Sequence, residues 1–259
     1  MSCSSCMHII KGRYKTMPLM DEFKEERAEI KNRSLKEKLS YFWDYYKWHL
    51  IGGIIGLAAV ISLVYSILNQ KETAFYAALL NVGQSLYSDD YKNDFTKLIG
   101  IDTKKEIVYF DLMMLNLSRM DDATVSTSQK ILVYVSAGDL DVMIGDTASI
   151  NHYAYINTGM DLRDFLTEEE IQKYEPYFYY MDKSLVEEAD GTTPASPEYP
   201  ADPSDPSTMK EPVPVAIRVD GCKTFSESYY LPGTTYLMVI TNTQHPDRAH
   251  TLLDYIWEN

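Results

Sequence analysis

The chain has 259 residues, of which 45% are hydrophobic and 12% aromatic, and this composition excludes a chain that is disordered throughout. Its net charge of −14 is unevenly distributed. Residues 1–71 hold 11 Lys/Arg against 7 Asp/Glu, whereas residues 72–259 hold 13 against 31. Such an acidic part repels phosphates, so nucleic acid and anionic lipid head groups are excluded as its partners.

The first 16 residues give few structural signals. A Cys-x-x-Cys at positions 3–6 has too few further ligands nearby to hold a metal, so we expect none there. The codons of Lys11-Gly12-Arg13 can form a purine-rich run, placed before Met17 where a bacterial ribosome-binding site would lie. We therefore expect translation to begin at Met17, with residues 1–16 an artefact of start-site choice.

Residues 49–69 are predicted to form a transmembrane helix. The 19 residues from Leu50 to Leu68 carry no charge, and at about 1.5 Å per residue they form roughly 28 Å of helix, which matches a bilayer's hydrocarbon core. A buried globular helix normally has a polar stripe, and a cleaved signal peptide has a shorter apolar region that begins earlier. The residues predicted to contact lipid are Leu50, Ile51, Ile54, Ile55, Leu57, Val60, Ile61, Leu63, Val64, Ile67 and Leu68.

The charges that flank this span predict its orientation. The basic residues before it are Arg33, Lys36, Lys38 and Lys47. After it, Lys71 is the only cation within about 20 residues, and cytoplasmic flanks are the ones enriched in Lys and Arg. We therefore expect a single-pass protein of the cell membrane, with residues 1–48 cytoplasmic and residues 72–259 extracellular.

Two further features concern the helix itself. Six aromatic residues crowd positions 41–48, where amphipathic rings favour the head-group layer, and the spacing of Ser34 and Glu37 predicts a juxtamembrane helix that begins at Ser34. Gly52 and Gly56 form a Gly-x-x-x-Gly that would let two helices approach closely, so the sequence allows a homodimer. The alternative is a plain anchor in which the motif arises by chance.

The acidic part is predicted to be an α/β domain. Its first half alternates strands at 74–82, 106–115 and 140–144 with helices at 88–98, 122–137 and 151–156. This alternation is typical of a mostly parallel sheet with helices on both faces. The second half predicts a short acidic helix from Thr167, strands at 177–181, 213–219 and 236–241, and a closing helix at 246–257.

Residues 183–212 interrupt this second half with a segment rich in Pro, Ser and acidic residues, which predicts a loop. Proline recurs at every third position from 194 to 206, and that period fits an extended polyproline II spine. The alternative is an ordinary solvated surface loop.

Two stretches resemble type II extracellular solute-binding proteins, the receptors that deliver substrates to ATP-driven importers. Residues 136–146 (SAGDLDVMIGD) are similar to that family's helix, Gly-Asp turn and buried strand. Residues 236–255, which begin YLMVITNTQHP, resemble its strand, Asn-x-x-x-Pro turn and terminal amphipathic helix. The resemblance implies one lobe or a reduced form, because residues 72–259 are few for two lobes. The chain is also similar to uncharacterised membrane proteins of Gram-positive gut bacteria.

Ligands of open parallel sheets bind beyond the carboxyl ends of the strands, because helix N-termini and free backbone amides converge there. This rule nominates Asn81, Gln84 and Ser85 after the first predicted strand, and Asp146 and Thr147 after the third. The alternative for Asp146 is a helix N-cap, which needs no ligand.

Other chemistry finds little support in the sequence. Asp139, Asp141 and Asp146 could together hold a hard cation, but such residues more often shape turns, and the outer histidines lack the spacing of a zinc helix. The aromatic runs at 174–180 and 225–230 favour core packing over sugar binding. We expect no metal, no cofactor and no enzyme, since neither a nucleophile elbow nor a phosphate loop is present.

These features together predict a membrane-anchored extracytoplasmic module that binds or senses a small molecule. The resemblance implies a transporter as its membrane partner. The alternative is a non-enzymatic envelope protein for interaction or assembly, whose solute-binding-like domain has lost its ligand.

Overall fold

The computed structural model describes residues 34–119, 121–187 and 202–258. The predictions on the translation start, on the Cys-x-x-Cys and on Arg33 lie outside these residues, as does most of the proposed polyproline spine. The chain divides into two compact units, Met1–Asn69 and Gln70–Asn259.

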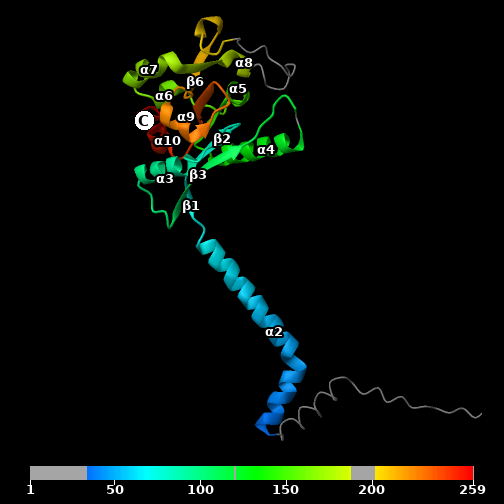
Figure 1. Ribbon diagram of the computed structural model, residues 1–259. Helices are drawn as coiled ribbons and strands as arrows, with labels where there is room; N and C mark the ends of the chain where they lie inside the picture. Colours follow the sequence, from blue (N-terminus) through cyan, green and yellow to red (C-terminus); the bar gives the residue numbers. More distant parts are fainter. Residues whose placement is uncertain (1–33, 120, 188–201, 259) are drawn as a thin grey trace, which may run out of the picture. The chain divides into compact units, whose positions relative to one another are not determined.

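A single long helix, α2 (Leu35–Leu68), makes up the described part of the first unit (Figure 1). It begins directly after Ser34, as the capping spacing predicted, and the juxtamembrane segment continues without a break into the predicted span. Within α2, Tyr46–Leu68 is long and apolar enough to cross a membrane. None of that span is buried by the described residues, so its apolar surface is available to lipid.

The second unit is built on a six-stranded sheet in the order β3-β1-β4-β8-β6-β5. Its strands are β1 (Glu72–Leu80), β3 (Glu106–Met113), β4 (Val142–Asp146), β5 (Phe178–Asp182), β6 (Pro212–Arg218) and β8 (Thr235–Val239). The pairings of β1 with β3 and with β4 are parallel, whereas β8 pairs antiparallel with both β4 and β6, and β5 pairs antiparallel with β6. Four strands, β1, β3, β4 and β6, therefore run in one direction. We call the end of the sheet where these four begin the amino end, and the end where they finish the carboxyl end.

Helices cover both faces of this sheet, as predicted for an α/β domain (Figure 1). The helices are α3 (Ser88–Leu98), α4 (Asp122–Ala137), α5 (Thr147–Tyr155), α6 (Leu162–Phe165), α7 (Glu168–Tyr174), α8 (Lys183–Glu187), α9 (Lys223–Ser228) and α10 (Pro246–Glu258). Residues of α3, α9 and α10 share one apolar cluster, and residues of α4 and α5 share the cluster on the opposite face. A third cluster joins α6, α7 and α10.

Burial along the strands explains their places in the sheet. In β1 the seven residues from Ala74 to Leu80 are all buried, as expected for a strand with neighbours on both sides and helices on both faces. In β3 buried and more exposed residues alternate for much of its length, which suits its place at the border of the sheet. The closing helix α10, predicted at 246–257, buries Ala249, Leu252, Leu253 and Ile256, which form its apolar face.

Several local features differ from the prediction for physical reasons. The third strand begins at Val142 rather than at position 140, and the side chain of Asp141 just before it accepts hydrogen bonds from the Tyr76 amide of β1 and from the Thr243 hydroxyl. The following helix begins at Thr147 rather than at 151, because Asp146 caps it through the backbone amide of Ser149. Helix α9 and the small antiparallel pair β2 (Gly83–Gln84) and β7 (Tyr229–Tyr230) had no strong periodicity and were not predicted.

The segment 183–212 is not entirely loop. Its beginning forms α8, and a 3₁₀ turn, η2 (Pro206–Thr208), lies near its end. Another 3₁₀ turn, η1 (Glu175–Tyr177), precedes β5. Asp182, which is buried, holds both ends of the segment, because its carboxylate accepts hydrogen bonds from the amide of Ser184 (3.1 Å) and from those of Lys210 (2.8 Å) and Glu211 (3.1 Å).

Candidate functional site

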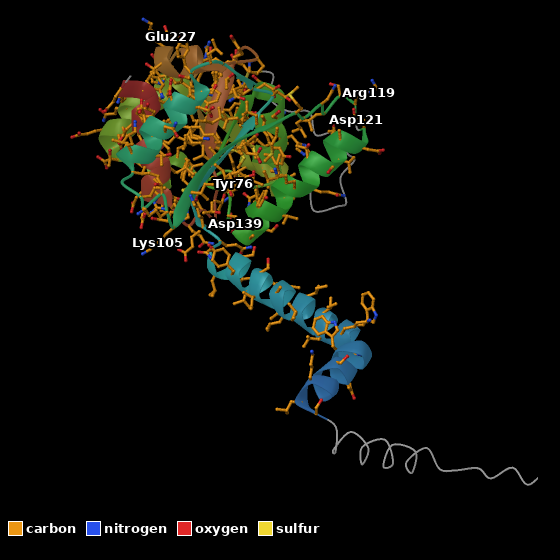
Figure 2. All side chains as sticks on the ribbon, turned by 60° about the horizontal axis from the view of Figure 1, so that its bottom comes forward. Tyr76, Lys105, Arg119, Asp121, Asp139 and Glu227 are labelled. Atoms are coloured by element: carbon orange, nitrogen blue, oxygen red, sulfur yellow. The ribbon has the colours of Figure 1, made fainter. Side chains whose placement is uncertain are left out.

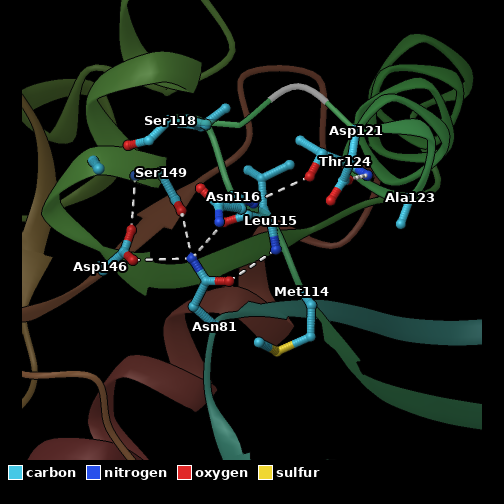
Figure 3. Close-up of a pocket in the computed structure, with 12 residues that line it drawn as sticks. Asn81, Met114, Leu115, Asn116, Ser118, Asp121, Ala123, Thr124, Asp146 and Ser149 are labelled. Carbon is cyan, nitrogen blue, oxygen red and sulfur yellow. Dashed lines mark hydrogen bonds between the residues drawn. The ribbon is translucent and has the colours of Figure 1, made fainter.

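A cavity of about 420 Å³ lies at the carboxyl end of the sheet, where β1, β3 and β4 finish and where α4 and α5 begin (Figure 3). Loops and helix N-termini converge at this place because the three strands are parallel neighbours. Its polar lining includes Asn81, Asn116, Ser118, Asp121, Asp146 and Ser149.

Asn81 forms the floor of this cavity and joins three elements. It has a φ of 59°, in the left-handed region that Asn tolerates better than most residues. Its side chain acts as an extra rung between β1 and β3, since Oδ1 accepts from the amide of Leu115 (2.8 Å) and Nδ2 donates to the carbonyl of Leu115 (2.9 Å). Nδ2 also donates to Oδ2 of Asp146 (2.9 Å). This floor is therefore fixed before any ligand arrives.

Two aspartates cap the helices that open onto the cavity. Asp146 accepts from the amide of Ser149 (2.8 Å) and caps α5, and Asp121 accepts from the amide of Thr124 (2.9 Å) and caps α4. The bond from the Thr124 amide holds the pKa of Asp121 below its usual value, so this exposed carboxylate is ionised at neutral pH. Among the residues that the structure describes, the lining of this cavity holds two carboxylates and no basic side chain.

The loop after β3 supplies polar groups that are not used elsewhere. Among the described residues, the side chains of Asn116 and Ser118 make no hydrogen bond, although both line the cavity. Sequence reasoning did not nominate them, or Asp121, because the rule on strand ends was applied to the first and third strands only. The same rule at the end of the second predicted strand would have found this loop.

Of the five residues predicted to bind a ligand, the structure brings Asn81 and Asp146 together in this cavity. Gln84 lies in β2 and pairs with Tyr229 of β7. The Ser85 hydroxyl donates to the carbonyl of Ser228 (2.7 Å), which ties this loop to α9. Thr147 is the exposed first residue of α5 and does not line the cavity.

The three aspartates considered as a cation site do not meet. Asp141 lies before β4 and Asp146 ends it, at opposite ends of the sheet. Asp139 follows the last turn of α4 and lies at the opposite end of that helix from Asp121 (Figure 2). Asp141 is fully buried, and its carboxylate accepts from the amide of Tyr76 (2.8 Å) and from the hydroxyl of Thr243 (2.5 Å). Its role is therefore structural.

One histidine-containing cluster lies elsewhere in the domain. His250 of α10 contacts Glu170 of α7 through Nε2 (2.8 Å) and Asp254 through Nδ1 (3.2 Å). These three residues have ligand atoms within 4.8 Å of one another. Both ring nitrogens already contact a carboxylate, however, and Glu170 also closes the capping box of α7 with Thr167. The cluster therefore serves to hold α7 on α10.

Comparison with protein families, with curated protein sequences and with solved structures found no match to this chain.

Proposed function

We propose that the chain is a membrane-anchored, non-enzymatic module that binds or senses a small solute outside the cell. The observation that carries this proposal is the cavity where β1, β3 and β4 end, with its preformed floor and its unused polar side chains. Parallel α/β sheets place their ligands at such an end. The long apolar helix α2 supports the anchor, and the excess of cations before it supports a cytoplasmic N-terminus.

The lining of the cavity indicates the class of solute. Asp121 and Asp146 contribute negative charge and acceptor atoms, and the carbonyl and hydroxyl oxygens of Asn116 and Ser118 add further acceptors. A solute that brings hydrogen-bond donors or a positive charge, such as an amino sugar, an amine or a polyhydroxy compound, complements this lining. An anion would meet two carboxylates, so the capped helix N-termini do not favour one.

Contacts between two segments support a relation to solute-binding proteins and, through it, to a transporter. The stretches 136–146 and 236–255, which carry that resemblance, lie side by side because β4 pairs with β8. Asn242 donates to the carbonyl of Val135 (2.6 Å), at the end of α4. Gly138 has a φ of 73°, and a Cβ there would lie 3.2 Å from the carbonyl oxygen of Asn242. The two stretches thus form one packed unit rather than two isolated similarities.

A matched pair of variants tests the binding proposal in the full chain held in lipid nanodiscs. Thermal unfolding would be followed with sugars, amino sugars, cationic amino acids, short peptides and divalent ions. We expect at least one solute to stabilise the chain in a concentration-dependent way, by about 2.7 kcal/mol at 100 times its Kd. Asp121→Asn keeps the cap but removes the charge, so it should weaken that response about tenfold.

The control for this experiment is Asp205→Asn, which makes the same change at the cap of η2, a residue that does not line the cavity. It should leave the response to the solute unchanged. A flat response to every solute would contradict the proposal, and so would an equal loss in both variants.

The anchor and its orientation have a separate test. The full chain should remain in the membrane fraction at alkaline pH and be released only by detergent. Protease added to intact cells should digest residues 72–259 and leave residues 1–48 protected. Recovery of the chain in the soluble fraction, or protection of the C-terminal part, would contradict this orientation.

The carboxyl end of the sheet also favours a second candidate function, contact with another envelope protein. Four large apolar side chains are exposed near it, namely Leu86 (92%), Tyr87 (63%), Met114 (74%) and Tyr230 (68%). Such residues are enriched in protein interfaces when they lie together. A flat solute panel, combined with a membrane protein that co-purifies with the wild type and is lost from Leu86→Ser, would favour this second function.

A further inference from the structure

A second cavity, of about 470 Å³, lies at the carboxyl end of β6 on the face of the sheet that α10 covers. It is lined by Tyr177, Arg218, Gly221, Lys223, Ile256 and Trp257, together with Cys222. Its charge is opposite to that of the first cavity, because its lining, within the described part of the chain, holds two cations and no carboxylate. This is unexpected in a part of the chain with 13 basic residues against 31 acidic ones.

The walls of this cavity are aromatic and apolar. The rings of Tyr177 and Trp257 meet edge to face, with centroids 4.6 Å apart, and Ile256 is fully buried. Burial raises the pKa of the Cys222 thiol to about 11, so this group is neutral and adds no negative charge. A Cβ at Gly221 would meet no atom within 4 Å, so that side of the cavity is open.

The indole nitrogen of Trp257 is the second, independent observation. It is buried and has no hydrogen-bond partner among the described residues. Leaving a buried donor unpaired is costly, and native proteins usually supply an acceptor. The atom therefore calls for an acceptor that the described chain does not provide.

The cations are only partly neutralised by the chain. Arg218 binds Asp220 through Nε (2.7 Å) and Nη2 (2.8 Å), which leaves Nη1 without a partner among the described residues. The Lys223 ammonium lies 3.8 Å from the carboxylate of Glu227, and its side chain is 81% exposed. Both can therefore still contact an anion.

We propose that this second cavity binds a small carboxylate with an aromatic or aliphatic body. The carboxylate would contact Arg218 and Lys223 and, after a small movement of the ring that exposes its buried nitrogen, accept from the Trp257 indole, while its apolar body lies against the ring of Tyr177. This site is distinct from the acidic cavity and does not depend on the function proposed for it.

Tryptophan fluorescence offers a direct test, because the chain has three tryptophans and Trp257 is the one outside α2. In the full chain in nanodiscs, Trp43→Phe and Trp48→Phe would leave Trp257 as the sole reporter. Phenylacetate, 3-phenylpropionate and hexanoate are the probes, and phenylacetamide is the neutral control. We expect a saturable change in Trp257 emission with at least one carboxylate and a Kd at least about tenfold weaker for the amide.

Variants in that background locate the site. Lys223→Gln should weaken binding about tenfold, whereas Lys97→Gln, which alters a similarly exposed lysine of α3, should have no effect. Gly221→Leu would place a side chain in the open volume and should abolish the response without unfolding the chain. The proposal is overturned if none of the three carboxylates gives a saturable change, if the amide binds equally well, or if both lysine variants behave alike.

Discussion

The two ends of the sheet use the same acidic residue types in opposite ways. At the amino end, Asp141 and Asp182 are buried, and their carboxylates accept hydrogen bonds from donors of the protein itself. At the carboxyl end, Asp121 and Asp146 each cap a helix with one oxygen and line a cavity. Burial and the number of internal donors, rather than residue type, therefore separate a structural carboxylate from one that is available to a ligand.

The largest effect is expected from Asp141, whose loss removes an acceptor from β1 and from the turn before α10. Asp141→Ala should lower the free energy of unfolding by about 4 kcal/mol, because it leaves the Tyr76 amide and the Thr243 hydroxyl unpaired. The same change at the other end of β4, Asp146→Ala, should cost about 1 kcal/mol, the usual value for an N-cap. Urea unfolding of the detergent-solubilised chain measures both. Equal losses would remove the distinction between the two ends.

Acid should destabilise the amino end of the sheet, because it protonates the carboxylate of Asp182. Burial by itself raises the pKa of Asp182, but hydrogen bonds from Lys210, Ser184 and Glu211 outweigh it and hold the pKa below its usual value. A carboxyl group whose pKa is lowered in the folded state stabilises the protein at pH values above its unfolded pKa, which is about 3.9 for Asp. This stabilisation is lost as the pH falls through the lowered pKa of the folded state.

The melting temperature should therefore fall as the pH drops below about 4, and Asp182→Asn should flatten that part of the profile. Melts recorded at a series of pH values measure this. An unchanged acid profile in Asp182→Asn would show that Asp182 does not contribute.

A smaller effect is expected at Asn81, whose side chain both joins β1 to β3 and lines the cavity. Asn81→Asp keeps the size of the side chain but replaces its amide donor with a second carboxylate next to Oδ2 of Asp146, 2.9 Å away in the native chain. We expect a loss of about 1 to 2 kcal/mol at neutral pH that shrinks when one carboxylate is protonated. Unfolding at pH 7 and pH 4.5 measures the difference, and a loss that does not depend on pH would count against this arrangement.

Much of the fold could be predicted because its signals are local. The uncharged run in α2, the apolar run in β1 and the single apolar face of α10 each fix an element without long-range information. The direction of β8, which lies between β4 and β6 and runs against both, could not be predicted, because it depends on pairing with β6, about 20 positions away, and with β4, more than 80 positions away.

The candidate site was harder to predict for the same reason. Asn81 and Asp146 could be nominated because each follows a recognisable strand. The basic cavity could not, since Arg218, Lys223 and Trp257 come from separate elements and have no common spacing in the sequence. The role of Asp141 was also hidden, because its partners Tyr76 and Thr243 lie 65 and 102 residues away.

Hydrogen exchange followed by mass spectrometry tests the difference between the two ends most directly. The full chain in nanodiscs would be compared with and without the solute that stabilises it most. We predict that the solute slows exchange in the peptides that cover 114–124 and 146–151. Exchange in the peptides that cover 139–143 and 241–246 should not change. Protection at the amino end instead, or no local protection despite a raised melting temperature, would contradict a ligand site at the carboxyl end of the sheet.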